Sequence, residues 1–123
     1  MNHKTKLLLV DDNAPYLRMV SLNLKNLGFE VLTTSNPREA HRLAREFGPD
    51  VLLLDVVMPQ QDGGDLYNVL RADPAFKHTP ILFVTAASTT VAQHNGMTFI
   101  PKPVKMEILL AEIQKALNPA KPV

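Results

Sequence analysis

The chain has 123 residues, of which 46% are hydrophobic and 20% are charged. This size suits one compact domain with its own apolar core, because two separate domains would each be too small to bury enough surface. The formal net charge of +1 gives no electrostatic footprint for binding nucleic acid or membranes. The absence of cysteine excludes disulfides and thiolate metal sites and is compatible with a reducing compartment.

The two ends of the chain carry no targeting signal that we can identify. The first apolar run, Leu7–Val10, is far too short for a signal-peptide core or a membrane span. We therefore expect a soluble, cytoplasmic protein that does not bind membranes. Residues 119–123 include two prolines and cannot sustain a helix. We expect the domain to cover residues 1–118 and residues 119–123 to be a tail or the start of a linker.

The first predicted strand is the apolar run Lys6–Val10. Apolar residues then recur every three or four positions from Leu17 to Leu27, a spacing that predicts a helix ending at Gly28. A second strand is predicted at Phe29–Thr34.

The next helix has a recognisable start. Asn36 is the predicted cap, Pro37 takes the first helical position, and Glu39 is the acid expected to reach back to the cap. An apolar stripe continues from Ala40 to Phe47, and the helix is expected to end at Gly48-Pro49.

The second half of the chain repeats this alternation. Strands are predicted at Asp50–Leu54, Ile81–Thr85 and Met97–Ile100, and helices at Gly64–Arg71 and Lys105–Leu117. Between the last two strands, Ser88–Gly96 is rich in poor helix formers and ends in a turn signal. We expect a fourth helix there that is short, irregular, displaced or partly disordered.

The alternation predicts an α/β fold, with a single doubly wound, five-stranded parallel sheet covered by helices on both faces. Runs such as Val51–Leu54 show no polar alternation, which is typical of strands buried on both faces. In such sheets, ligands bind at the carboxyl ends of the strands, beside the switch in strand order.

Acidic residues gather at these strand ends. Asp11 and Asp12 follow the first strand, and Asp55 follows the third. Crowded carboxylates repel one another, and a hard divalent cation removes that conflict. Mg²⁺ prefers a few carboxylate oxygens together with water and phosphate, whereas Zn²⁺ is disfavoured because the set contains no histidine or cysteine.

Two further strand ends add groups that can bind phosphate. Thr85 ends the fourth strand, and Lys102 follows the fifth. A hydroxyl and an ammonium could each contact an oxygen of a transferring phosphoryl group. An aspartate can be the nucleophile of such a transfer, and Asp55, on the central strand, is the candidate.

These residues resemble the receiver domains of bacterial response regulators, the CheY-like (flavodoxin-like) family, over essentially the whole chain. The matching motifs are, in order, Leu-Leu-Leu-Val-Asp11-Asp12-Asn13, Leu-Leu-Leu-Asp55-Val-Val-Met-Pro59, Gly63, Val-Thr85-Ala86 and Ile-Pro-Lys102-Pro103. The resemblance implies that Asp55 is the phosphoacceptor. It also implies that Asp12 binds Mg²⁺ directly, Asp11 binds it through water, and the backbone carbonyl of Val57 supplies a further ligand.

The resemblance assigns the remaining site residues to signalling. Lys102 would contact the phosphoryl group, Thr85 would move toward it on activation, and Phe99 would be the switch aromatic residue. The bond before Pro103 is usually cis in the family. The implied phosphodonor is a histidine kinase or phosphotransfer protein, and the implied output is binding of an effector protein rather than of DNA. A homodimer through the fifth strand and last helix is a further possibility.

Several alternatives stay open at this point. The chain could be a scaffold or adaptor that keeps the fold without being phosphorylated. A phosphohydrolase is disfavoured because Val57 stands where those enzymes typically place a second acid. Asp11-Asp12-Asn13 could merely cap a helix, and Phe99 could be core filler.

Apolar neighbours follow two of the site residues. Val56 and Val57 follow Asp55, and Ala86 and Ala87 follow Thr85. Polar side chains at some of these positions can orient an attacking water. We therefore expect a phosphorylated state that hydrolyses slowly.

Overall fold

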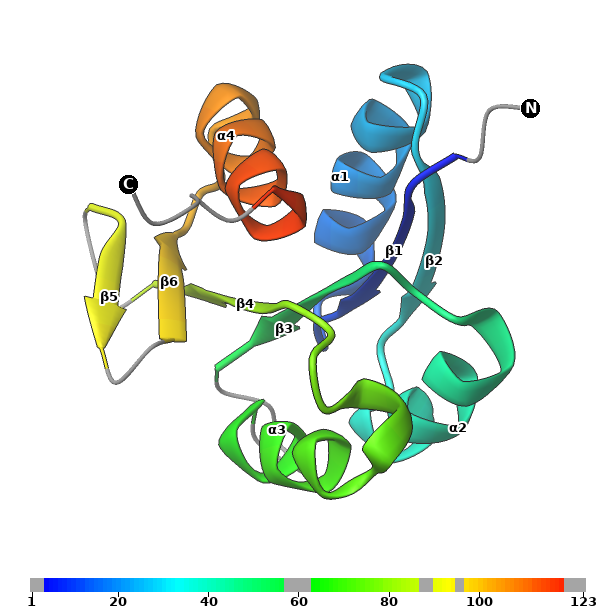
Figure 1. The fold of residues 1–123 in the computed structure, drawn as a ribbon. Coiled ribbons are helices and arrows are strands. Elements are labelled where there is room, and N and C mark those ends of the chain that lie inside the picture. Colours follow the sequence, from blue (N-terminus) through cyan, green and yellow to red (C-terminus); the bar gives the residue numbers. More distant parts are fainter. Residues whose placement is uncertain (1–3, 57–62, 87–89, 95–96, 119–123) are drawn as a thin grey trace.

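The computed structural model describes residues 4–56, 63–86, 90–94 and 97–118. A twisted sheet runs through the centre of the molecule with helices on both sides (Figure 1). In chain order the elements are β1 (Lys6–Val10), α1 (Ala14–Asn26), β2 (Glu30–Thr34), α2 (Pro37–Phe47), β3 (Val51–Asp55), α3 (Gly63–Ala72), the short 3-10 helix η1 (Pro74–Phe76), β4 (Ile81–Thr85), β5 (Ala92–His94), β6 (Met97–Pro101) and α4 (Met106–Leu117).

The strand order is β2-β1-β3-β4-β6-β5. All neighbouring strands are parallel except β5, which pairs antiparallel with β6. The chain runs outward from β1 to β2 and then returns to the other side of β1 with β3, so the switch in strand order lies between β1 and β3. The predicted α/β architecture is confirmed, and the switch point directs attention to the ends of these two strands.

Two apolar cores, one on each face of the sheet, hold the layers together. Helices α1 and α4 cover one face, and α2 and α3 cover the other (Figure 1). Side chains alternate between the cores along β3: Leu53 lies in the α1–α4 core, whereas Leu52 and Leu54 lie in the α2–α3 core. Burying each leucine contributes about 1.5–3 kcal/mol, which explains why the central strands are apolar on both faces.

Helix α1 ends where the sequence predicts, before Gly28, and begins at Ala14, three residues before the predicted apolar stripe. The Asn13 side chain accepts a hydrogen bond from the backbone N–H of Tyr16 at 3.1 Å, and Gly28 adopts a left-handed φ of 100° after the last turn. A stripe of buried residues, Leu17, Val20 and Leu24, anchors the helix to the sheet. This start matters for function because it fixes the segment directly after β1.

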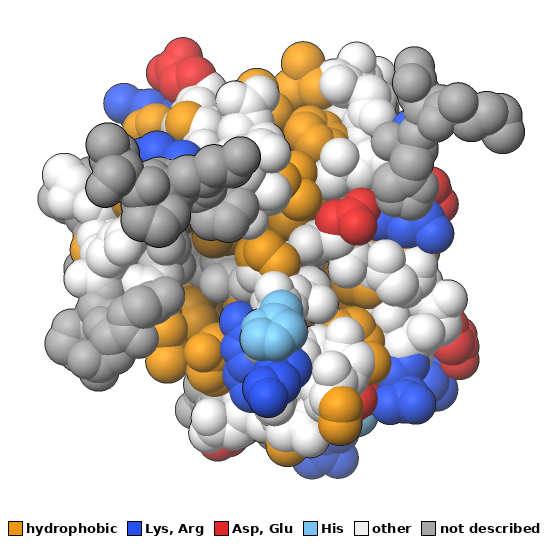
Figure 2. All heavy atoms as spheres, in the orientation of Figure 1, with side chains coloured by type: hydrophobic (Ala, Val, Ile, Leu, Met, Phe, Trp, Pro, Cys, Tyr) orange, Lys and Arg blue, Asp and Glu red, His pale blue; other side chains and the backbone are white. Residues whose placement is uncertain are grey.

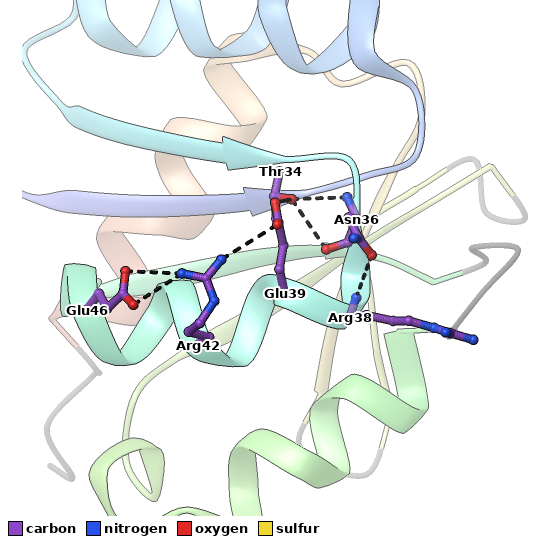
Figure 3. A network of polar contacts seen from close by, with 6 residues as sticks. All are labelled: Thr34, Asn36, Arg38, Glu39, Arg42 and Glu46. Carbon is purple, nitrogen blue, oxygen red and sulfur yellow. Dashed lines mark hydrogen bonds and ion pairs between the residues drawn. The ribbon is translucent and has the colours of Figure 1, made fainter.

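The start of α2 differs from the prediction in one contact. Asn36 caps the helix by accepting from the N–H of Arg38 at 3.0 Å (Figure 3). Glu39, however, does not bond back to the cap N–H: its carboxylate accepts from the Thr34 hydroxyl at 2.6 Å, and the Asn36 N–H donates to the same hydroxyl oxygen at 3.0 Å. The hydroxyl of the buried Thr34 thus bridges Glu39 and Asn36: it accepts the Asn36 N–H that Glu39 was expected to bind.

The largest correction concerns the segment between β4 and β6. We predicted five strands and a short or irregular fourth helix within Ser88–Gly96. The sheet instead has a sixth strand, β5, whose residues Ala92–His94 pair with Met97–Phe99, and the described residues of the segment contain no helix. Thr90 and Val91, which stand directly before β5, are β-branched and disfavour a helix in this segment.

The remaining predicted elements agree with the structure to within one residue at each end. No helix among the described residues is long and apolar enough to cross a bilayer. On the face drawn in Figure 2, the acidic and basic side chains of the described residues are interspersed with apolar and neutral ones. Residues 119–123, predicted as a tail or linker start, lie outside the described residues.

Candidate functional site

The predicted site residues meet at the carboxyl end of the sheet. Asp11 follows β1 directly, Asp55 is the last residue of β3, and Thr85 is the last residue of β4. These three side chains are buried, with residue exposures of 3%, 8% and 8%, whereas Asp12 is exposed. Polar groups are rarely buried unless they have partners, so their presence at the ends of otherwise apolar strands marks this edge as a candidate site.

Three carboxylates form what we call the acidic cluster: Asp11, Asp12 and Asp55. Each offers one oxygen, and these three oxygens lie within 4.8 Å of one another. The pairing of Val10 with Leu54 explains the approach, because it brings the ends of β1 and β3 to the same level. Carboxylate oxygens at this spacing are the donors that Mg²⁺ prefers, and no softer ligand belongs to the cluster.

Lys102 brings a positive charge to the acidic cluster. Its ammonium donates to Asp11 Oδ2 at 2.6 Å and lies 3.5 Å from Asp55 Oδ1. The backbone N–H of Lys102 donates to the Thr85 carbonyl at 2.8 Å, which fixes the lysine backbone to the end of β4. The bond to Pro103 is cis, as the resemblance implied. The Lys102 ammonium thus contacts two of the three carboxylates, Asp11 and Asp55.

Tyr16, in the first turn of α1, is a site neighbour that the sequence analysis missed. Its ring centroid lies 4.8 Å from the Lys102 ammonium. Burial raises the pKa of the phenol above its usual value of 10.0, and the negative charges of Asp11 and Asp55 raise it further. The phenol is therefore neutral at physiological pH, and its ring face is what it presents to the lysine.

The alternative interpretation of Asp11-Asp12-Asn13 as a helix cap is correct for one of its residues. Asn13 caps α1, and Asp11 Oδ1 accepts the Asn13 backbone N–H at 2.9 Å. Asp11 therefore has two tasks: one oxygen holds the start of the helix, and the other binds Lys102. This fixes the orientation of the Asp11 carboxylate toward the acidic cluster.

Phe99, the predicted switch residue, lies on β6 and is half-buried. Its ring stacks on that of Phe83 with centroids 5.2 Å apart and an interplanar angle of 18°, and the Phe83 ring is 5.6 Å from that of Tyr67. Phe99 thus packs against the α2–α3 core. Thr85 follows Phe83 by two positions on β4, so strand alternation places Thr85 and the aromatic stack on the same face.

Two parts of the predicted motifs cannot be placed. Val57, whose carbonyl was expected to bind the metal, and Pro59 lie outside the described residues. Gly63, the third motif position, is the first residue of α3.

Comparisons with known proteins agree with this geometry. The family model described as "Response regulator receiver domain" matches residues 7–114. The chain is 33% identical to the DNA-binding response regulator MtrA of Mycobacterium tuberculosis over 94% of its own length, but it spans only 51% of MtrA. Among solved structures, the chemotaxis response regulator CheY4 of Vibrio cholerae is 34% identical with a TM-score of 0.83, covering 94% of this chain and all of CheY4.

A second solved structure is the receiver domain of the sensor histidine kinase PA1611 from Pseudomonas aeruginosa. It is 25% identical with a TM-score of 0.81, and the match covers 94% of this chain and 98% of that one. The family match spans every strand and helix of the sheet described above except the ends of β1 and α4. The chain belongs to the response regulator receiver domain family, and it is accordingly a regulatory phosphoacceptor domain that works as a phosphorylation-activated signalling switch.

Proposed function

We propose that Asp55 accepts the phosphoryl group and that Lys102 and Thr85 assist it. The observation that carries this assignment is the position of Lys102, whose ammonium bridges Asp11 at 2.6 Å and Asp55 at 3.5 Å. A buried carboxylate at a strand end, with a cation beside it, is a suitable nucleophile for phosphorus. Asp11 and Asp12 follow β1, on the other side of the switch in strand order, and in this proposal they do not attack phosphorus.

Mg²⁺ fits the donor set of the acidic cluster, which is made of carboxylate oxygens alone. In our proposal Asp12 binds the ion directly, Asp11 binds it through water, and Asp55 and the backbone carbonyl of Val57 complete the protein ligands. When bound, the ion neutralises negative charge on the transferring phosphoryl group. PA1611 is described with a magnesium ion coordinated in its active-site cleft, which supports the assignment by similarity.

The chemistry assigned to the chain is a single displacement. An Asp55 carboxylate oxygen attacks phosphorus, an acyl phosphate bond forms, and the bond from phosphorus to the donor breaks, with its electron pair leaving on the donor. The Lys102 ammonium and the Thr85 hydroxyl each contact a phosphoryl oxygen. Receiver domains interact with histidine kinases or phosphotransfer proteins, and we propose a donor of this kind here, with a phosphorylated histidine as the source of the phosphoryl group and the histidine imidazole as the leaving group.

Phosphorylation would be read through Thr85 and Phe99. Added negative charge draws in the Thr85 hydroxyl, and the space that it leaves is on the face where Phe99 stacks. The proposed output is binding of an effector protein, or a homodimer through β6 and α4, in the cytoplasm. The hairpin of β5 and β6 borders this face and replaces the helix that we had expected there.

The experiment is phosphorylation with acetyl phosphate and Mg²⁺, followed by intact-mass and peptide mass spectrometry. Wild type is expected to gain one phosphoryl group on Asp55, and the Asp55→Asn variant none, while both give the same circular dichroism. Absence of any modification in folded wild type would favour the scaffold alternative. Loss of the label over time also measures hydrolysis, which we expect to be slow because Val56 and Ala86 offer no polar side chain to orient water.

A further inference from the structure

The ring of Tyr16 lies against the ammonium of Lys102, with 4.8 Å between the nitrogen and the ring centroid. An ammonium at this distance from an aromatic face is attracted by the ring quadrupole. We infer that Tyr16 is a positioning residue for phosphoryl transfer: its ring holds the Lys102 ammonium between Asp11 and Asp55. This inference rests on the proposed role of Lys102 and assigns to Tyr16 a task that packing alone would not require.

A lysine at this position needs positioning because the hydrogen bond of its backbone does not fix its ammonium. The backbone N–H of Lys102 is bonded to the Thr85 carbonyl, but the ammonium sits at the end of a four-carbon stem. Such a stem has many rotamers, and their entropy opposes any single placement. Within the described residues, the ammonium contacts the Asp11 and Asp55 carboxylates and the Tyr16 ring.

The three contacts differ in whether they persist during the reaction. Asp11 and Asp55 belong to the acidic cluster, so a bound cation would share their negative charge and weaken their hold on the lysine. The Tyr16 ring is not an oxygen ligand, and it does not change charge when a metal or a phosphoryl group arrives. It is therefore the contact best able to keep the ammonium in place while the carboxylates are engaged elsewhere.

The ring itself is held by the same segment that holds Asp11. Asp11 accepts the N–H of Asn13 at 2.9 Å, and Asn13 accepts the N–H of Tyr16 at 3.1 Å. These two hydrogen bonds connect the backbone of Tyr16, through Asn13, to the Asp11 carboxylate that binds Lys102. The half-buried ring also packs against the α1–α4 core, which limits its motion. The start of α1 thus presents an acid and an aromatic face to one ammonium.

Two variants separate a positioning role from simple filling of space. Tyr16→Phe keeps the ring and removes only the hydroxyl, whereas Tyr16→Met keeps much of the apolar bulk and removes the ring face. A filling role predicts that both variants behave like wild type. A positioning role predicts that Tyr16→Phe keeps the Lys102 ammonium in its wild-type position and that Tyr16→Met does not.

The first measurement needs neither metal nor phosphodonor. In NMR spectra of the metal-free protein, the Lys102 side-chain protons nearest the ammonium should resonate upfield in wild type and Tyr16→Phe because they lie near an aromatic face. This upfield shift should be lost in Tyr16→Met. Equal Lys102 shifts in wild type and Tyr16→Met would overturn the inference.

The second measurement is the rate of phosphorylation by acetyl phosphate at saturating Mg²⁺. Tyr16→Met should be slower by roughly threefold to tenfold, as expected for loss of one cation–π contact, and Tyr16→Phe should match wild type. The Mg²⁺ affinity of Tyr16→Met, measured by calorimetry, should be no weaker than that of wild type. A weaker affinity would show that the variant disturbs Asp11 itself, and would contradict a role confined to Lys102.

The two measurements distinguish failure of this inference from failure of the proposed function. If wild type accepts a phosphoryl group and folded Tyr16→Met accepts it at the same rate, the inference is wrong and the proposed function stands. If wild type accepts none, the proposed function is wrong, and with it the catalytic purpose assigned to Tyr16.

Discussion

Two groups of ionisable side chains in this molecule differ in the balance of their charges. In the acidic cluster, three carboxylates lie close together, and the Lys102 ammonium contacts two of them, Asp11 and Asp55. In the second group, which we call the Asp73 cluster, one carboxylate has two partners: Asp73 Oδ2 contacts His41 Nε2 at 2.8 Å and also Arg45 Nη1. Its other oxygen accepts the backbone N–H of Ala75 at 2.9 Å and caps η1.

The comparison separates a site that needs a ligand from one that is complete. The hydrogen bond from His41 and, to a smaller degree, the Ala75 N–H and Arg45 together lower the pKa of Asp73 to about 2. Asp73 is therefore ionised and fully partnered, and it ties α2 to the segment after α3. In the acidic cluster, one oxygen from each of three carboxylates lies within 4.8 Å of the others, and such crowding is the condition under which carboxylates bind a divalent cation.

The largest effect should come from removing one acid of the acidic cluster. Asp12→Ala should weaken Mg²⁺ binding by about tenfold or more, because the ion loses a charged ligand. Calorimetric titration measures the affinity, and Glu107→Ala, which removes an exposed acid from α4, is the matched control. Equal Mg²⁺ affinities in Asp12→Ala and the control would contradict the assignment of the acidic cluster as the metal site.

Removing the Lys102 ammonium should strengthen Mg²⁺ binding. Lys102→Ala leaves the three carboxylates without their ammonium, so we expect Mg²⁺ to bind roughly fivefold more tightly, the size of a partly screened charge interaction. The same variant should uncouple phosphorylation from output binding. Weaker Mg²⁺ binding than in wild type would show that Lys102 supports the acidic cluster instead of competing with the ion.

The Asp73 cluster should affect stability without affecting chemistry. Asp73→Ala removes the cap of η1 and leaves His41 and Arg45 without their shared partner, so the Tm should be lower than in wild type. Mg²⁺ affinity and the phosphorylation rate should be unchanged. Thermal unfolding and the acetyl phosphate assay measure these quantities, and a loss of phosphorylation in folded Asp73→Ala would mean that the two clusters are coupled.

The smallest effect is a dependence of stability on pH. Because the pKa of Asp73 is lowered from 3.8 to about 2 in the folded state, its ionised form stabilises the fold above pH 4. That contribution is lost as the pH falls from about 4 to about 2. The difference in unfolding free energy between wild type and Asp73→Asn should thus be constant from pH 7 to 5 and shrink below pH 4. A difference that grows on acidification would have the wrong sign.

The acidic cluster could be predicted from sequence because each of its members directly follows an apolar strand. Parallel strands bring their carboxyl ends to one edge, so the positions of Asp11 and Asp55 along the chain were enough to place them together. Lys102 and Thr85 followed by the same rule. Their assigned roles stay predictions until they are tested chemically.

The segment between β4 and β6 was predicted wrongly because its poor helix formers were interpreted as a short or irregular helix. The stronger local signals were the β-branched Thr89, Thr90 and Val91 and the Asn95-Gly96 pair, which is typical of a two-residue hairpin connection. These signals favour β5, the strand that the structure contains. Similarity to a family with a helix at this position outweighed them.

Tyr16 could not be identified from sequence as a neighbour of Lys102, since the two are far apart in the chain and meet only through the fold. Tyr16 also lies before the apolar stripe that predicted the helix, which begins at Leu17. The Thr34 hydroxyl that bonds Glu39 was missed for a similar reason, because helix-cap patterns consider only residues of the helix start.

The most direct test of the central claim is a titration of the wild-type protein with Mg²⁺, followed by amide NMR. Our account predicts saturable binding of one ion, with the largest changes at Asp11, Asp12, Asp55 and Lys102 and none at Asp73. Spectra that do not change with Mg²⁺, or that change equally at both clusters, would contradict it.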